Sequence, residues 1–319
     1  MKPMLSLLAL VAAASLTSCL GEDKVEEKGT ATYGGASCLN HVTDLQTGEA
    51  FVSNTPPSYK FDFNFTEATA DIEMSNIQLA QNFSALSFIL PTMKAEADYY
   101  YTKMQGTDLV PTNAASQYVV SKFLARYSNR VWNGNFYPVY QIAYTINNRY
   151  SVSVIPTQLL LFGTTTAYRV PGKDEETTET PRYTYRGGEK NYYTLQLVTN
   201  SIEDATATGA THTLAMRIGN AQFAETMTQT DIVVDKLPVS ITADGFVSKT
   251  EEGTTVTVKN YAGSEVTTAK IADMRIRASV SMATLVEFDI VCDGFQGLTG
   301  TYHVTANIDN FIIDENTDK

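Results

Sequence analysis

The chain has 319 residues, and its 23 Lys and Arg against 35 Asp and Glu give a formal net charge of −12 at pH 7. This acidic balance argues against nucleic acid as a partner, because phosphate backbones are bound by clustered positive charge. It also argues against a polybasic contact with anionic lipid headgroups. The 18 Tyr and 14 Phe favour β-strands.

The first residues have the layout of a secretory signal peptide. Lys2 supplies a positive charge, and the apolar run that follows, Met4–Leu16, is shorter than the roughly 20 residues of a membrane-spanning helix. The run ends in Leu16-Thr17-Ser18-Cys19, which resembles the lipobox of bacterial lipoproteins. The resemblance implies that residues 1–18 are a lipoprotein signal peptide and that Cys19 becomes the lipidated N-terminus. An ordinary signal peptide with an incidental cysteine is the alternative.

Residues 19–29 are polar and charged and lack aromatic side chains, so we expect a flexible acidic tether. Acidic residues this close to Cys19 resemble the surface-export signal of Bacteroidota lipoproteins. The resemblance implies a protein anchored to the outer membrane by its lipid and facing the cell exterior. A solvated spacer facing the periplasm is the alternative.

An eight-residue pattern, Asn-x-Gln-apolar-Ala-x-x-apolar, occurs twice, at Asn76–Phe83 and 144 residues later at Asn220–Met227. Weaker matches flank it in the same order, pairing 88–91 with 232–234, 30–33 with 165–168, 55–56 with 180–181 and 150–155 with 302–308. Recurrence at a fixed spacing indicates an internal duplication. We therefore predict one module over residues 30–162, a second over 163–312 and a tail at 313–319.

Apolar and polar residues alternate with a period of two in several segments, which is typical of half-buried strands. The clearest are 61–65, 140–146, 254–258 and 274–278. Turn signals separate such runs at Asn147-Asn148, Asp244-Gly245 and Glu252-Gly253. The sequence therefore predicts an all-β fold of two tandem antiparallel β-sandwich or small-barrel modules, with seven or eight strands in each.

Two further cysteines, Cys38 and Cys292, stand near the start of the first module and near the end of the second. An exported protein meets oxidising conditions, which permit a disulfide between them. Two free thiols packed as small apolar side chains are the alternative.

The sequence contains no motif that predicts catalytic residues, a metal site or a cofactor. The three histidines, His41, His212 and His303, lack the spacing of a zinc site, and two of them, His212 and His303, read as half-exposed residues of strands. No Gly-x-Ser-x-Gly elbow or glycine-rich phosphate loop is present. Carboxylates are plentiful, so a hydrolase that uses two of them stays open as a less favoured reading.

The most distinctive stretches are 99–101, three consecutive tyrosines, and 130–138, which contains the only tryptophan. Aromatic rings stack on sugars or anchor protein interfaces, and amides bond to hydroxyl groups. The second module has the shorter, ring-free stretch 279–283 in the corresponding place. The candidate ligand-binding residues are Tyr99, Tyr100, Tyr101, Trp132, Asn133, Asn135 and Tyr137. Burial of these rings in the core is the alternative.

The lipobox, the acidic tether and the duplicated β module together resemble uncharacterised Bacteroidota outer-membrane lipoproteins with calycin-like or β-sandwich domains. The resemblance and the predicted location lead us to expect a non-catalytic surface binding or accessory protein, with a glycan or an outer-membrane protein as its partner. A structural surface protein, such as a fimbrillin-like subunit, is the alternative function.

Overall fold

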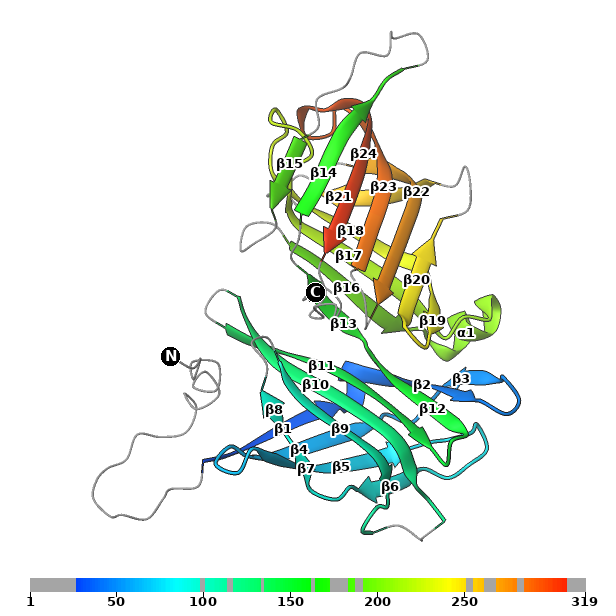
Figure 1. Cartoon of the computed structure of the whole chain (residues 1–319). Helices are drawn as coiled ribbons and strands as arrows, with labels where there is room; N and C mark the ends of the chain where they lie inside the picture. The colour runs from blue at the N-terminus through cyan, green and yellow to red at the C-terminus, as the bar shows by residue number, and fades with distance from the viewer. Residues whose placement is uncertain are drawn as a thin grey trace, which may run out of the picture. The chain divides into compact units, whose positions relative to one another are not determined.

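The computed structural model describes residues 27–97, 101–113, 117–132, 135–161, 164–172, 183–186, 192–250, 255–260, 268–279 and 284–308. The chain divides into two compact units, Met1–Pro156 and Thr157–Lys319 (Figure 1). The predicted signal peptide, Cys19 and the tail at 313–319 lie outside the described residues.

Two predicted boundaries need correction. The first strand begins at Lys28, so the end of the predicted tether at residues 28–29 is ordered as a strand. The units meet between Pro156 and Thr157 rather than at 162/163. The reason is that Gln158–Leu161 pairs with a strand of the second unit, from Tyr193 to Gln196.

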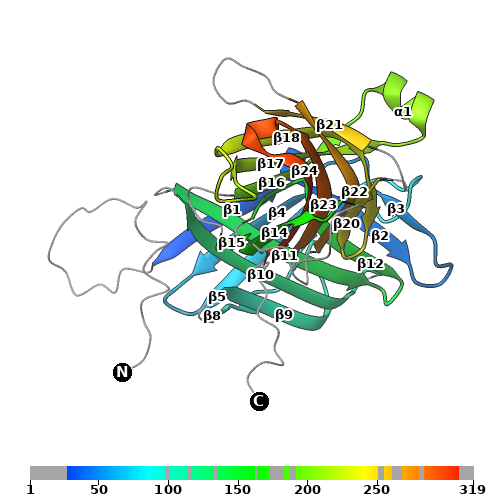
Figure 2. The same ribbon diagram turned by 90° about the horizontal axis from the view of Figure 1, so that it is seen from above.

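The predicted all-β class is confirmed, because every strand pair in the described residues is antiparallel. The described part contains one α-helix, α1 (Ile202–Thr208), and two 3-10 turns, η2 (Gly35–Ser37) and η3 (Phe295–Gly297). Helix α1 connects two strands of the second unit and lies outside the sheet (Figure 2). None of the helices in the described ranges is long and apolar enough to cross a membrane.

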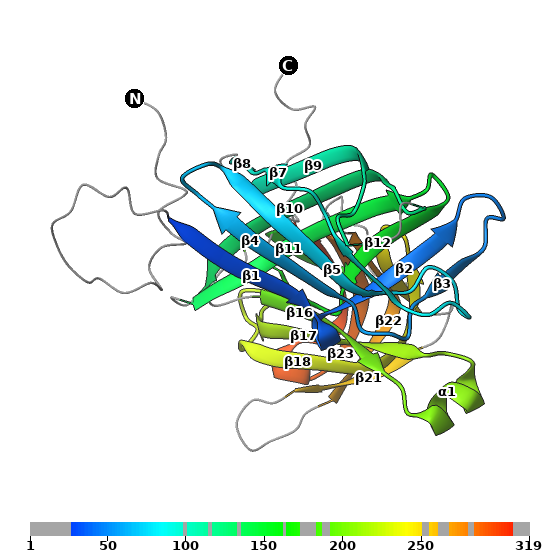
Figure 3. The ribbon, with the colours of Figure 1, turned by 90° about the horizontal axis from the view of Figure 1, so that it is seen from below.

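The first unit is a sandwich of two sheets. The five-stranded sheet runs in the order β1 (Lys28–Gly34), β4 (Ser58–Asn64), β5 (Thr69–Ile77), β6 (Leu86–Ile89), with β7 (Met93–Lys94) also on β5. The seven-stranded sheet runs β3 (Ala50–Val52), β2 (Cys38–Asp44), β12 (Tyr150–Pro156), β11 (Asn135–Ile146), β10 (Val120–Trp132), β9 (Thr102–Leu109), β8 (Glu96–Ala97). Figure 3 shows β1, β4 and β5 side by side in one layer.

Aromatic side chains fill the space between these two sheets. Alternate residues of β4 point inward, so that Tyr59, Phe61 and Phe63 are buried as the period of two predicts. The ring of Tyr33 on β1 stacks on Tyr140 of β11, with centroids 4.3 Å apart. Packing of this kind buries large apolar areas and fixes how one sheet lies on the other.

The second unit is one continuous 12-stranded sheet. Its order is β13 (Gln158–Leu161), β16 (Tyr192–Thr199), β17 (His212–Ala221), β18 (Thr230–Pro238), β21 (Thr255–Asn260), β22 (Thr268–Ser279), β23 (Thr284–Asp293), β24 (Thr299–Ile308), β14 (Thr164–Val170), β15 (Tyr183–Arg186). Two short strands, β19 (Ser240–Thr242) and β20 (Gly245–Lys249), pair with each other, and β20 also pairs with β22. The sheet folds over itself, since Tyr193 on β16 bonds through its hydroxyl to the Oγ1 of Thr165 on β14, 3.0 Å away.

The two units repeat one connectivity. Strands β13, β16, β17 and β18 follow the order of β1, β4, β5 and β6, and β15, β14, β24, β23 and β22 follow that of β3, β2, β12, β11 and β10. They differ at one edge. In the second unit β18 pairs with β21 and so joins the two halves. In the first unit the corresponding edge of β6 forms hydrogen bonds with residues 112–113. The backbone N–H of Ile89 donates to Asn113 Oδ1 at 2.7 Å, and the carbonyl of Ile89 accepts from Thr112 N at 2.8 Å.

The repeated eight-residue pattern has the same structure in both units. The pairs of β5 with β6 recur 144 residues later between β17 and β18, as Glu73↔Ile89 and Arg217↔Val233, Met74↔Phe88 and Ile218↔Ile232, Ile77↔Leu86 and Ala221↔Thr230. Both ladders are interrupted at the pattern's asparagine, whose φ is 61° at Asn76 and 50° at Asn220. The glutamine side chain then bonds to the turn, since Gln78 Nε2 donates to Phe83 O and Gln222 Nε2 to Met227 O, both at 3.4 Å. Asparagine tolerates the left-handed region better than most residues, which explains why it stands at this bulge.

Some of the flanking sequence matches lie on corresponding strands of the two units, and others do not. Residues 150–155 and 302–308 lie on the corresponding strands β12 and β24. Residues 30–33 lie on β1 and 165–168 on β14, strands that do not correspond, so that match is wrong. A match of four residues is short enough to arise between unrelated strands of similar composition.

The turns agree with the sequence wherever they are described. Asn147 and Asn148 connect β11 to β12 with φ of 53° and 51°, and Asp244-Gly245 joins β19 to β20. The predicted turn at 252–253 and the match at 180–181 lie outside the described residues. Each unit has twelve described strand segments, more than the seven or eight predicted, because several are ladders of only two to four residues.

Candidate functional site

The predicted aromatic stretch at 130–138 forms the far end of the hairpin of β10 and β11. These strands pair from Val120↔Ile146 to Trp132↔Asn135. Strand β9 pairs with β10 only as far as Tyr127, and β12 pairs with β11 only over residues 143–146. In the described ladders, residues 128–132 and 135–139 therefore pair with each other alone. We call this two-stranded extension the hairpin ribbon.

Three of the predicted binding residues are placed on the ribbon by their backbone. Trp132 ends β10, Asn135 begins β11, and Tyr137 pairs with Arg130. Asn133, Tyr99 and Tyr100 lie outside the described residues. The hairpin of β22 and β23 is the counterpart in the second unit; its strands end at Ser279 and begin at Thr284.

Tyr101 is a packing residue. It is only 8% exposed, and the guanidinium carbon of Arg126 lies 5.1 Å from the centroid of its ring, within the range of a cation–π contact. The next residue, Thr102, pairs with Tyr127 at the base of the ribbon. The fold thus places Tyr101, the one tyrosine of the 99–101 run that is described, beside the base of the ribbon, where it is buried.

A cluster of polar side chains lies on the outer face of the second unit, and the sequence did not predict it. The sheet-face cluster comprises Tyr168 on β14, His303 and Thr305 on β24, and Glu287 and Asp289 on β23. His303 Nδ1 lies 2.7 Å from Asp289 Oδ1, while His303 Nε2 lies 3.2 Å from Thr305 Oγ1 and 3.4 Å from Glu287 Oε1.

The side chains of this cluster remain accessible to solvent. The exposed fractions are 24% for His303, 26% for Asp289 and 32% for Glu287. The ring of Tyr168 is also half-buried and lies 5.2 Å from the imidazole, centroid to centroid. The alternate residues of the same strands, such as Val304 and Phe288, form the core. The two carboxylates can accept hydrogen bonds from a ligand, and the half-buried ring beside them offers a flat surface.

Asp289, His303 and Thr305 line up as an acid, a base and a hydroxyl do in nucleophilic catalysis. Two features argue against that chemistry. Strand β24 pairs along both of its edges, with β14 and β23, so the ladders take up its own backbone N–H groups and the strand offers none of them to an oxyanion beside Thr305. Glu287 also faces the same imidazole nitrogen as the Thr305 hydroxyl. The arrangement favours binding over catalysis.

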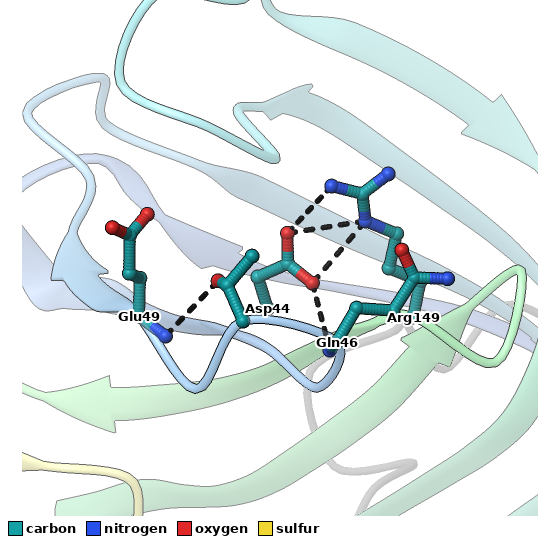
Figure 4. A network of polar contacts seen from close by, with 5 residues as sticks. Asp44, Gln46, Glu49 and Arg149 are labelled. Carbon is teal, nitrogen blue, oxygen red and sulfur yellow. Dashed lines mark hydrogen bonds and ion pairs between the residues drawn. The ribbon is translucent and has the colours of Figure 1, made fainter.

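The ion pair of Asp44 and Arg149 is the centre of another polar network, which is drawn in Figure 4. The Asp44 carboxylate accepts from Arg149 Nη2 at 2.7 Å, from Arg149 Nε at 3.1 and 3.2 Å and from the backbone N–H of Gln46 at 2.9 Å. The Arg149 guanidinium holds the pKa of Asp44 below its usual value. Since these donors occupy the carboxylate, the network holds the turn between β2 and β3 against the turn between β11 and β12 and offers little to a ligand.

The two cysteines and the other two histidines belong to the cores. Cys38 and Cys292 are free thiols, each buried in its own unit, which is the second of the two readings that the sequence left open. Burial raises the pKa of Cys38 to about 12 and that of Cys292 to about 11. His41 and His212 are each 8% exposed, so His212 is more buried than predicted. Among the residues that the structure places, no group of three or more His, Cys, Asp or Glu side chains could hold a metal ion.

Comparison with known proteins gives no relative from which a role could be transferred. No protein-family model, no curated protein and no solved structure matches this chain.

Proposed function

We propose that this chain is a non-catalytic binding or accessory lipoprotein of the bacterial cell envelope, anchored to the outer membrane through Cys19. The lipobox-like Leu16–Cys19 segment supports the anchor. Each buried CH₂ of an acyl chain contributes about 0.8 kcal/mol, so several chains on one residue retain a protein durably at its membrane. The acidic residues that follow support an orientation toward the cell exterior.

The hairpin ribbon is the observation that carries the binding role. A two-stranded ribbon lacks the additional strands that stabilise a wider sheet, so stability alone does not explain why these two strands are so long. This one ends at Trp132, the only tryptophan of the chain. Tryptophan and tyrosine supply much of the binding energy at protein interfaces and stack on sugars. Its partner is a glycan or an outer-membrane protein.

The proposal includes the origin of the two units by duplication. The shared strand order, the equal registers at the repeated pattern and the same asparagine bulge support it. The units then diverged at two places, with the ribbon in the first and the sheet-face cluster in the second.

The alternative of a fimbrillin-like subunit requires a sheet edge that is open to an incoming strand. The edge of β6 is a poor candidate, because Asn113 donates through Nδ2 to Ser87 O at 3.2 Å and accepts from Ile89 N. A side chain already occupies the polar groups that a donor strand would need.

The anchor is tested by labelling cells with radioactive palmitate. The wild-type chain should take up the label and a Cys19→Ala variant should not. A Cys38→Ala variant is the matched control and should be labelled like the wild type. Equal labelling of the Cys19→Ala variant would show that the anchor assignment is wrong.

The ribbon is tested with a trimmed variant in which Asn-Gly replaces residues 130–137. Asn-Gly closes a two-residue hairpin between strands, so the sheet itself should be preserved. Thermal-shift screening against glycans, haem, bile acids and calcium should give a ligand whose effect disappears on trimming. At 100 times its dissociation constant a ligand stabilises the fold by about 2.7 kcal/mol, which is readily measured. If every ligand that stabilises the wild type stabilises the trimmed variant equally, the ribbon is not the binding site.

A further inference from the structure

The sheet-face cluster occupies positions that the first unit fills with small residues. In the second unit, His303 pairs with Tyr168 on one side and with Asp289 on the other. The corresponding residues of the first unit are Ser151, Thr43 and Thr145. The neighbouring position on each strand is buried and fixes this correspondence. There Ala167, Val304 and Phe288 of the second unit take the places of Val42, Val152 and Tyr144 of the first. The same fold is therefore built without an aromatic ring, an imidazole or a carboxylate at these positions.

The two carboxylates are likewise particular to the second unit. Glu287 and Asp289 are two residues apart and so lie on the same face of β23. The first unit has Ala143 in the place of Glu287. A group of polar residues that the fold does not need marks a functional surface.

From this placement, we propose that the outer face of β14, β24 and β23 is a second binding site, and that its ligand is a neutral saccharide unit of a glycan. The half-exposed ring of Tyr168 gives a flat apolar surface on which the C–H face of a sugar ring stacks. The carboxylates of Asp289 and Glu287 accept hydrogen bonds from sugar hydroxyls. The contacts of His303 with Asp289 and Thr305 hold the imidazole in place between them.

The charges of the site favour a neutral ligand over a charged one. Two carboxylates repel phosphate, sulfate and acidic sugars. The exposed Arg275 on β22 stands opposite Glu287 in the ladder, and its positive charge offsets part of the attraction for a cation. Hydroxyl groups are the donors that suit the remaining acceptors.

The experiment compares binding of the purified full chain in detergent to an array of neutral oligosaccharides, including glucans, mannans, xylans and galactans. The variant carries the first unit's residues, Tyr168→Thr, His303→Ser and Asp289→Thr, which corresponding strands already accommodate. We expect it to lose at least tenfold in affinity for the sugar that the wild type binds, because one aromatic stacking contact alone is worth about a factor of ten. A single Asp289→Asn variant should lose several-fold.

The controls separate this site from the ribbon and from general damage. A Thr145→Ala variant, at the position that corresponds to Asp289, and the ribbon-trimmed chain should both keep the sugar affinity, and urea unfolding should show the triple variant folded. Absence of any bound neutral oligosaccharide would overturn the proposal, as would equal binding by the triple variant. Binding of oligolysine in place of sugars would likewise overturn it. The ribbon proposal would be unaffected in all three cases.

Discussion

The buried hydroxyl of Tyr59 provides the sharpest test of how the first unit is held together. It donates to Asn40 Oδ1 at 2.7 Å and lies 3.1 Å from the hydroxyl of Tyr144. Tyr59 and Asn40 have no exposed surface, and Tyr144 is 2% exposed. The three residues come from β4, β2 and β11 and link the two sheets.

A Tyr59→Phe substitution keeps the ring and removes only the hydroxyl. Each buried hydrogen bond contributes about 1 kcal/mol net, and a buried acceptor left without its donor costs about 1–3 kcal/mol. Since the change deletes two bonds and leaves the Asn40 carbonyl without this donor, we expect a loss of about 2–3 kcal/mol. The corresponding Tyr193→Phe in the second unit removes the hydrogen bond to Thr165 Oγ1, and the loss of that bond should cost about 1 kcal/mol.

Urea unfolding followed by tryptophan fluorescence measures this difference. Trp132 is the only tryptophan and belongs to β10 of the first unit, so its signal follows that unit. With a slope of about 2 kcal/mol per molar urea, Tyr59→Phe should lower the midpoint by about 1 M. Tyr193→Phe should leave the fluorescence midpoint in place and shift only the part of the circular dichroism change that comes from the second unit. A shift below about 0.3 M for Tyr59→Phe, or one no larger than that of Tyr193→Phe, would refute this account of the network.

The same hydroxyl governs stability at alkaline pH. Burial raises the pKa of Tyr59 well above its usual value. The folded state therefore keeps a proton that the unfolded chain releases above about pH 10. This contribution to stability is fully present below pH 10 and is lost as the pH rises further. The Tyr59→Phe variant should lose less stability than the wild type above that pH.

Three other perturbations follow from single positions. Cys38 and Cys292 should resist a thiol reagent in the folded chain and react once it is unfolded, as mass mapping of labelled peptides would show; fast labelling of the native protein would contradict their burial. Burial lowers the pKa of His41, so it stabilises the fold above about pH 6.5 and loses that contribution as the pH falls. A His41→Thr variant should therefore lose less stability than the wild type between pH 6.5 and about 5 in urea titrations, and an unchanged slope would count against this. At Asn76, with its φ of 61°, substitution by Ala should destabilise the first unit by about 1 kcal/mol and substitution by Gly by less, which the midpoint for tryptophan fluorescence would distinguish.

The sequence was sufficient for the features that depend on neighbouring residues. Alternation with a period of two identified the inward-facing residues of β4 and β11, and Asn147-Asn148 marked a hairpin with positive φ at both residues. The repeated pattern at Asn76 and Asn220 was recognisable because the bulge and the glutamine-bonded turn are local structures. Each is specified by eight consecutive residues, which need no distant partner.

The structure was needed for everything that depends on pairing between distant strands. Asp44 meets Arg149 across 105 positions of sequence, and the sheet-face cluster exists only because the ladders align Tyr168 with His303 and His303 with Asp289. On sequence alone His303 was a half-exposed strand histidine without partners, and the choice between binding and burial for Tyr101 stayed open. Registers between strands are set by the summed burial of two whole faces, and a slip of one residue would turn every side chain to the opposite face. The sequence by itself therefore determined the class of fold and its local turns, and the tertiary structure decided which polar residues meet.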